Sequence, residues 1–397
     1  MVETITVILT WAFLIIAGLP VFYIILLTLA AFFPGQREKE SPQPRRIAVL
    51  VPAHNESLLI ADTVADVLKQ RYPRDRFSLL VIADNCSDDT SEKAAGGDAR
   101  VLERSGNPGK GQSLNDALRL LLDEDWDAFL VMDADSHLHP DTLMRLDRVL
   151  ENGAKAVQIR YGVSNPGDSV RTLAMELTTA SFNALRPRGR TALGMSSGIY
   201  GNGFCLSREV VEKVPYLAHS IVEDIEYHLH LLKAGYKVAF VDQVWVKAQM
   251  PMGGRGSEVQ RVRWERGRLK MIRRYAPGLM QQAVKGDSFA LDALLDVIMP
   301  PVSVIALLIL PPLVLGTPLQ KGLSLALVLA LFLHYLIAAW RYGSVRSLPR
   351  LALYVPWYIT WKTCIVISSL ITERELGWIR TDRHQSPSPD KNDKNAP

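Results

Sequence analysis

The chain has 397 residues, of which 48% are hydrophobic, and a formal net charge of +4. It is longer than one average domain and too apolar for an ordinary soluble protein, so membrane segments are expected. Because acidic and basic residues are mixed through most of the chain, no nucleic-acid partner is expected, and the spacing of Cys86, Cys205 and Cys364 fits neither a zinc site nor a disulfide framework.

The N-terminal segment carries no charge from Thr4 to Phe33. About 20 residues at a rise of about 1.5 Å each are enough to cross the hydrocarbon core of a bilayer. A cleavable signal peptide is the alternative, but Glu3 stands where basic residues would be expected and the apolar run is too long. We therefore predict a transmembrane anchor over residues 1–36. Basic residues follow it, so the positive-inside rule places the next region in the cytoplasm.

Residues 37–290 are predicted to form an α/β domain, preceded by a polar, proline-rich linker over Pro34–Arg46. Short apolar runs predict buried strands, and the stretches between them have helical periodicity. The predicted strands are IAVLVPA from Ile47, FSLLVIAD from Phe77, DAFLVMD from Asp127 and AKAVQIRY from Ala154, and the predicted helices cover 58–69, 111–122 and 140–152. This alternation predicts a mostly parallel sheet, whose ligands bind beyond the carboxyl ends of the strands.

Three further hydrophobic segments lie within residues 291–372: Val297–Leu315, Gly322–Trp340 and Leu351–Ile371. Each is long enough to cross a bilayer, and the first is expected to bend at its prolines, Pro300, Pro301, Pro311 and Pro312. Arginines flank the last segment on both sides, so we expect it to lie in the membrane interface, where its aromatic residues and Lys362 fit. Residues 373–397 are predicted to be a polar tail, disordered from Gln385.

The first two predicted strands end in polar segments that contain Glu56 and Asp84, respectively. Carboxylates at strand ends can accept hydrogen bonds from a nucleoside. The same residue types are common in turns and helix caps, so each segment alone also has a purely structural interpretation. Further along, Lys110 stands between two glycines at the start of a predicted helix and could offer a cation to a phosphate.

Asp133 and Asp135 follow the third predicted strand. Two carboxylates one residue apart repel each other at low dielectric, and a divalent cation between them would compensate. Ligands that are all oxygen favour Mg²⁺ or Mn²⁺. We therefore predict that Asp133 and Asp135 bind Mg²⁺ or Mn²⁺, which could neutralise a leaving diphosphate.

Two motifs occupy the second half of the domain. Glu223 and Asp224 fall in the first turn of a predicted helix, where acids suit the helix dipole, but a carboxylate there could also act as a general base. Gln260, Arg263 and Trp264 are spaced by three and four residues and share one face of a later helix. Arginine can grip a diphosphate, and tryptophan can stack on a sugar or base.

Taken in order, these residues resemble the D, DxD, ED and QxxRW motifs of family 2 glycosyltransferases with a GT-A fold. The matching positions are Asp84, Asp133 with Asp135, Glu223 with Asp224, and Gln260 with Arg263 and Trp264. The resemblance covers roughly residues 46–280 and is to the membrane-embedded branch that includes cellulose, chitin, hyaluronan and poly-N-acetylglucosamine synthases. It implies a Rossmann-like GT-A domain inserted between an N-terminal transmembrane helix and C-terminal membrane helices.

The resemblance also implies roles for these residues. Asp84 would contact the nucleobase, Asp133 and Asp135 the diphosphate and its metal, and Asp224 would be the base. Gln260, Arg263 and Trp264 would hold the donor diphosphate and the acceptor end, and Glu56 and Lys110 are assigned to the same donor site.

The implied reaction is an inverting transfer from a UDP-sugar to a glycan or lipid acceptor, which forms β linkages in polysaccharide or glycolipid synthesis. The expected location is the bacterial inner membrane, with the catalytic domain in the cytoplasm. Membrane lipids and an accessory membrane subunit are expected partners. The chain has fewer hydrophobic segments than large processive synthases, so polymer synthesis and single addition to a lipid stay as alternatives.

Two other classes of protein are alternatives. A nucleotidyltransferase would also use an α/β sheet with carboxylate-bound Mg²⁺, but a glycine-rich basic loop would be expected where this chain has PAHNES. A non-catalytic membrane protein that binds a nucleotide sugar or a polymer would not need Asp224 as a base.

Overall fold

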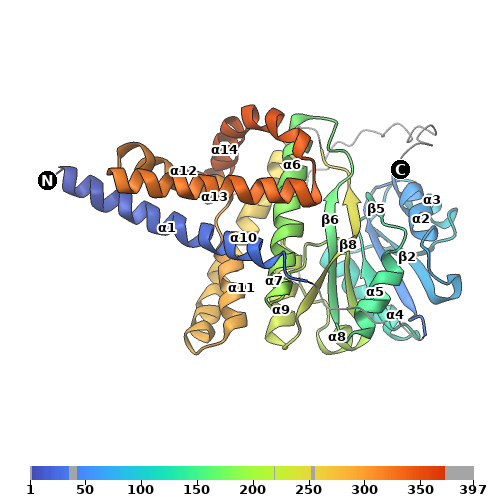
Figure 1. Cartoon of the computed structure of the whole chain (residues 1–397). Coiled ribbons are helices and arrows are strands. Elements are labelled where there is room, and N and C mark those ends of the chain that lie inside the picture. Colours follow the sequence, from blue (N-terminus) through green and yellow to red (C-terminus); the bar gives the residue numbers. More distant parts are fainter. Residues whose placement is uncertain (1, 35–42, 219, 252–254, 372–397) are drawn as a thin grey trace.

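The structure is a computed structural model, and it describes residues 2–34, 43–218, 220–251 and 255–371. An α/β domain lies at one end, and long helices project from one side of it (Figure 1). Residues 35–42 of the predicted linker and the predicted tail, 373–397, lie outside the described residues.

A single sheet forms the centre of the α/β domain, with its strands in the order β3-β2-β1-β4-β7-β6-β8-β5. The strands are β1 (Ile47–Ala53), β2 (Phe77–Asp84), β3 (Arg100–Arg104), β4 (Ala128–Val131), β5 (Ser136–Leu138), β6 (Ala156–Val163), β7 (Phe204–Ser207) and β8 (Val238–Ala248). The first four strands pair in parallel, as the alternation of strands and helices predicts. β7 is antiparallel to β4 and to β6, so the second half of the sheet is mixed.

Helices cover both faces of this sheet. On one face lie α2 (Ile60–Leu68), α3 (Thr90–Ala95) and α5 (Thr142–Glu151), and on the other α4 (Lys110–Leu122), α8 (Arg208–Lys213) and α9 (Glu223–Lys233). α6 (Val170–Ala180) and α7 (Arg186–Ala192) contact β6 and β8, respectively, whereas α10 (Arg255–Val284) and α11 (Ser288–Ile298) pack on α9 and on each other. A π-helical turn, Ser181–Leu185, joins α6 to α7.

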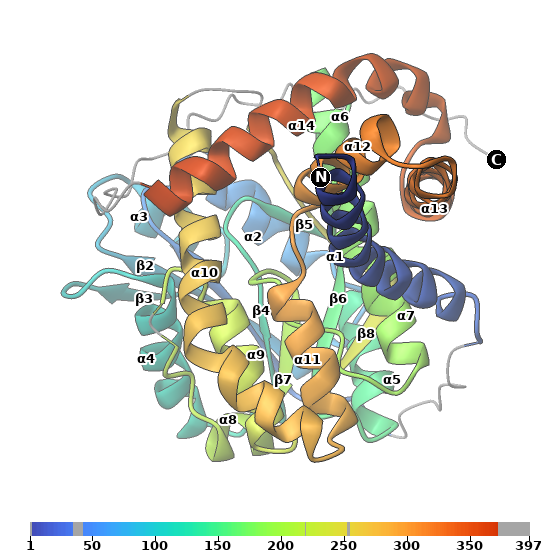
Figure 2. The ribbon, with the colours of Figure 1, turned by 90° about the vertical axis from the view of Figure 1, so that its left-hand side faces the viewer.

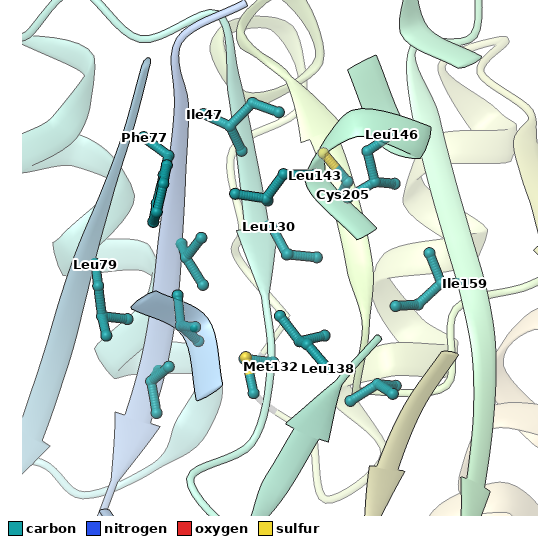
Figure 3. Packing of buried hydrophobic residues seen from close by; sticks show 14 of the residues in the cluster. Ile47, Phe77, Leu79, Leu130, Met132, Leu138, Leu143, Leu146, Ile159 and Cys205 are labelled. Atoms are coloured by element: carbon teal, nitrogen blue, oxygen red, sulfur yellow. The ribbon is translucent and has the colours of Figure 1, made fainter. Parts of the chain in front are cut away.

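The core explains why β1 is an unbroken apolar run. Ile47 and Val49 belong to one buried cluster, whereas Ala48 and Leu50 belong to the cluster on the opposite face of the sheet. A strand covered on both faces has no polar side. Figure 3 shows the first cluster, in which side chains of the strands meet Leu143 of α5.

Four helices make up the hydrophobic segments: α1 (Val2–Ala30), α12 (Val302–Leu315), α13 (Pro318–Tyr342) and α14 (Leu348–Ile371). By length and composition, three described helical stretches could cross a membrane, namely α1, α13 and Val345–Ile371, and the bent pair of α11 and α12 could be a fourth. Figure 1 shows α1, α12 and α13 side by side. Gln320 donates a hydrogen bond to the Val7 carbonyl and Arg341 to the Ala31 carbonyl, so α13 runs in the same direction as α1.

The predicted segment Val297–Leu315 is broken near its start. α11 ends at Ile298, α12 begins at Val302, and the two helices differ in direction by 80°. Pro300 and Pro301 lie in the break, where they remove two backbone N–H donors and end the helix. Only α12 therefore continues into the bundle with α1 and α13.

α14 is oriented differently from the other hydrophobic helices. Figure 2 shows it crossing over α10, while α1 and α13 are seen nearly end-on. Lys362 of α14 forms an ion pair with Glu265 of α10 at 2.6 Å. This is the arrangement that an interfacial helix would have, and the interfacial location of Leu351–Ile371 stays a prediction.

Candidate active site

A cavity of about 700 Å³ lies between the sheet and the helix bundle, and residues from distant parts of the sequence line it. Seven of the predicted site residues are among its lining: Glu56, Lys110, Asp133, Asp135, Glu223, Asp224 and Trp264. Several of them follow the carboxyl ends of parallel strands, where ligands bind in open α/β sheets.

Lys110 forms an ion pair with Asp133 in the lining of this cavity. Its ammonium group donates hydrogen bonds to Oδ1 of Asp133 and, at 2.7 Å, to the carbonyl oxygen of Gly201. Gly109 precedes the lysine with φ of 147°, which side chains rarely allow. After it, a Cβ on Gly111 would lie 2.1 Å from the carbonyl oxygen of Ala218. Both glycines are therefore required by the path of the chain around Lys110.

Gly201, whose carbonyl oxygen accepts the hydrogen bond from Lys110, also lies next to Asp224. Its φ of +74° is in the left-handed region, and a Cβ there would lie 3.5 Å from Oδ2 of Asp224. Asp224 is in the first turn of α9, and its Oδ1 accepts the backbone N–H of Ile225 at 2.8 Å. The predicted base thus lies beside the loop that also contacts Lys110, on the same side of the domain as Asp133 and Asp135.

The charges of this cluster perturb one another. Burial and then the charge of Asp224 raise the pKa of Glu223 to about 7. Burial also raises the pKa of Asp224, although Lys110 acts in the opposite direction. Burial alone would lower the pKa of Lys110, but the charges of Asp133 and Glu223 raise it. A carboxylate with a raised pKa is a stronger base, which suits proton abstraction near neutral pH.

Asp84 is not one of the described residues that line the cavity. It is 6% exposed, and its carboxylate accepts hydrogen bonds from Arg104 at 2.6 Å, Asn85 at 2.8 Å and the Gly109 backbone N–H at 3.0 Å. This carboxylate therefore anchors the loop that precedes Lys110. Its predicted contact with a nucleobase stays a prediction.

The QxxRW motif lies on α10. Trp264 lines the cavity and is 49% exposed, and its neighbours Glu265 and Arg268 also line the cavity. Arg263 is not among the described lining residues, and the side chain of Gln260 lies outside the described residues.

Sequence reasoning missed the loop that contains Gly198, Gly201 and Gly203. All three glycines have positive φ. Between the last two, Asn202 accepts the Asp133 backbone N–H through Oδ1 at 3.1 Å and donates to the Ser136 hydroxyl at 2.8 Å. Three glycines within six residues were the available signal, because such runs mark special backbone conformations.

The residues present fit a divalent cation that is shared with a phosphate. Asp133 already binds a positive group, the ammonium of Lys110, and Asp135 lines the same cavity. Within the described chain, no group of three or more His, Cys, Asp or Glu side chains could hold a metal ion alone. Mg²⁺ usually takes one or two carboxylates and completes its shell with water and substrate phosphates. The aspartate pair suits that kind of site.

Comparison with known proteins agrees with the motif order. Residues 44–267, more than half of the chain, match the model of a family described as "Glycosyltransferase like family 2". The chain is 27% identical over 253 residues to the protein described as "Probable glycosyltransferase YdaM" of Bacillus subtilis. The aligned residues cover 61% of this chain and 59% of that one.

Two further relatives have more specific names. A beta-monoglucosyldiacylglycerol synthase of Trichormus variabilis is 28% identical over 220 residues, or 53% of this chain and 46% of that one. A poly-beta-1,6-N-acetyl-D-glucosamine synthase of Staphylococcus aureus is 25% identical over 232 residues, which cover 56% of this chain and 54% of that one. The chain thus spans about half the length of these curated relatives.

The chain resembles a solved structure over nearly its whole length. That structure is the mannosyltransferase PcManGT from Pyrobaculum calidifontis in complex with GDP-Man and Mn²⁺, with a TM-score of 0.56 and 20% identity over 94% of this chain and 98% of that chain. At this identity the likeness shows the fold alone, a GT-A-like mixed α/β domain with apolar helices at both ends.

Proposed function

Because the chain belongs to glycosyltransferase family 2, we propose that it transfers a sugar from a UDP-sugar to a glycan or lipid acceptor, with inversion at the anomeric carbon. The observation that carries this proposal is the cavity lined by both the Lys110–Asp133 pair and Asp224. A group that binds a diphosphate and a group that deprotonates an acceptor must face the same pair of substrates, and the location of these residues in one cavity supports such roles.

The donor would be held at the sheet side of the cavity. Asp133 and Asp135 would hold Mg²⁺ or Mn²⁺, which supplies charge neutralisation for the donor diphosphate. Lys110 adds a fixed positive charge beside Asp133. Trp264 provides an aromatic face for the sugar or the acceptor end, and Glu56, Asp84, Gln260 and Arg263 complete the proposed donor site.

Asp224 would act as the general base. As its carboxylate takes the proton of the acceptor hydroxyl, the oxygen attacks the anomeric carbon, and the bond from that carbon to the diphosphate oxygen breaks. The nucleoside diphosphate leaves from the opposite face, so an α-linked donor gives a β-linked product. Burial raises the pKa of Asp224 and of the adjacent Glu223, and the charge of Asp224 raises the pKa of Glu223 further.

We propose further that the enzyme is an integral protein of the bacterial inner membrane and that its catalytic domain faces the cytoplasm. Support comes from helices that could cross a membrane and from the basic residues that follow α1. The proposed partners are membrane lipids and an accessory membrane subunit.

The test uses the full chain in lipid nanodiscs with a panel of UDP- and GDP-sugars and either metal. Release of the nucleoside diphosphate is expected from a UDP-sugar, and Asp224→Asn should lower it by about 10²–10⁴-fold. Asp75→Asn is a matched control because Asp75 is exposed, with a side chain that is 79% accessible. Equal turnover in Asp224→Asn and wild type would refute the assignment of the base.

Pyrophosphate release from a nucleoside triphosphate and a sugar phosphate would instead identify a nucleotidyltransferase. Tight UDP binding without turnover would identify a non-catalytic binding protein. The family match supports neither of these two classes.

A further inference from the structure

The cavity that holds the catalytic carboxylates also reaches the helix bundle. Its lining includes Ile24 of α1, Val302 of α12, and Met299 and Pro300 from the break between α11 and α12. Ile24 and Met299 are at the same time part of the buried core of the bundle. One end of the cavity is therefore bounded by the apolar side chains of helices that could cross a membrane.

Two ion pairs also contribute to the lining of this cavity. Arg186 pairs with Asp296 at 2.9 Å, and Lys362 pairs with Glu265 at 2.6 Å. Tyr358 of α14 and Trp264 of α10 add amphipathic aromatic rings to this lining. Such residues gather where a membrane changes from hydrocarbon to headgroups.

Because the lining of the cavity includes both apolar side chains of the bundle and charged and aromatic residues, we propose that the acceptor is a hydroxyl-bearing membrane lipid. Its acyl part would lie among Ile24, Met299 and Val302, and its hydroxyl would reach Asp224. This inference rests on the proposed glycosyltransferase function and narrows its acceptor from a glycan or a lipid to a lipid. A growing glycan would expose hydroxyl groups along its length, and apolar side chains would leave those hydroxyl groups without hydrogen-bond partners, which is unfavourable.

The break between α11 and α12 fits this assignment. A continuous apolar helix would satisfy its own backbone hydrogen bonds along its whole length. Here Pro300, Pro301 and an 80° bend separate α11, beside the α/β domain, from α12 of the bundle, and both prolines line the cavity. A lipid that stays in the bilayer could present its headgroup there. In the transfer, the lipid oxygen forms the bond to the anomeric carbon, Asp224 takes the proton, and the nucleoside diphosphate leaves with the bonding electron pair.

The experiment measures where the transferred sugar goes. The full chain in phosphatidylcholine nanodiscs is incubated with radiolabelled UDP-sugars, with or without dioleoylglycerol, and with soluble oligosaccharides in a separate arm. Label in the organic phase that depends on dioleoylglycerol is expected. Label found only in soluble oligosaccharides would overturn the proposal.

Two substitutions in α12 test whether the apolar end of the cavity binds the acyl part of the lipid. Val302→Trp should fill the apolar end and lower organic-phase label at least tenfold, while UDP-sugar binding measured by calorimetry confirms a folded donor site. Leu310→Trp is the control, because Leu310 lies on the same helix, is 52% exposed and is not among the described lining residues. Equal labelling by wild type and Val302→Trp would overturn the inference and leave the glycosyltransferase function standing. Absence of donor consumption in every arm would instead defeat the proposed function, and the acceptor assignment with it.

Discussion

The ammonium group of Lys110 donates a hydrogen bond to Asp133, although the lysine begins α4 and the aspartate follows β4. The same group contacts the Gly201 carbonyl, whose residue borders Asp224. One cation thus touches the proposed diphosphate-binding carboxylate and the loop beside the proposed base. Its charge offsets several negative charges, which explains how the acids can gather in one cavity.

Removal of this cation is the first prediction. Lys110→Met keeps the length of the side chain but not the charge, and we expect kcat/KM for the UDP-sugar to fall about 10²–10³-fold, as for other fixed charges at active sites. Lys110→Arg should recover part of the loss. Lys69→Met is the matched control, since the side chain of Lys69 is 72% accessible. Wild-type rates in Lys110→Met would contradict the role of the pair.

The second prediction concerns pH. Asp224 acts in its deprotonated form, so kcat/KM should fall as pH falls through its raised pKa, at a midpoint above the ordinary value of about 3.9 for aspartate. Burial and the charge of Asp224 raise the pKa of Glu223 to about 7, so Glu223 is still protonated while Asp224 titrates, and the neutral Glu223→Gln should leave the midpoint unchanged. A pH–rate series on both proteins measures the two midpoints. A midpoint at lower pH in Glu223→Gln would show instead that Glu223 loses its proton before Asp224.

The third prediction is metal dependence. EDTA should abolish nucleoside diphosphate release, and Mg²⁺ or Mn²⁺ should restore it. Asp135→Asn should raise the metal concentration needed for half-maximal turnover, because one anionic ligand is lost. The exposed Asp75→Asn should respond to metal like wild type. Full turnover in EDTA would exclude the proposed metal role of the aspartate pair.

The fourth prediction separates two roles of Asp84. If its carboxylate mainly anchors the loop at Gly109, Asp84→Asn should lower kcat, because the position of Lys110 changes. If it contacts the nucleobase, the substitution should instead raise KM for the UDP-sugar and weaken the preference for UDP over other nucleotides. Kinetics with UDP- and GDP-sugars distinguish the two results.

The first half of the domain could be predicted from sequence because its strands are buried on both faces and end in polar turns. Asp133 and Asp135 were placed correctly at the end of an apolar strand for this reason. The mixed second half was not predicted. β7 has only four residues, Phe204–Ser207, and follows the glycine-rich loop, so its antiparallel pairing leaves little periodic signal.

α7 illustrates a second limit. Its sequence, RPRGRTA, has the polarity of an exposed helix, yet Arg190 is 1% exposed. Asp292 and Asp296 of α11 neutralise it, with contacts at 2.5 and 2.7 Å. The partners are about a hundred residues away along the chain, and no local pattern reveals an ion pair of that separation. This cluster ties the α/β domain to α11 and, through Tyr23 bonded to Asp292, to α1.

The last prediction tests the contact between α1 and α7. A Cβ on Gly189 would lie 2.0 Å from the carbonyl oxygen of Leu27, so Gly189→Ala must push the two helices apart. We expect a loss of about 1–3 kcal/mol in stability, the usual cost of overpacking, and a lower midpoint of thermal unfolding in nanodiscs. Gly278→Ala in α10 is the matched control, because a Cβ there meets no atom within 4 Å. It should leave stability unchanged or raise it by about 0.5–1 kcal/mol, since alanine favours a helix over glycine. Equal melting of the two variants would mean that the close approach of α1 to α7 at Gly189 does not contribute to stability.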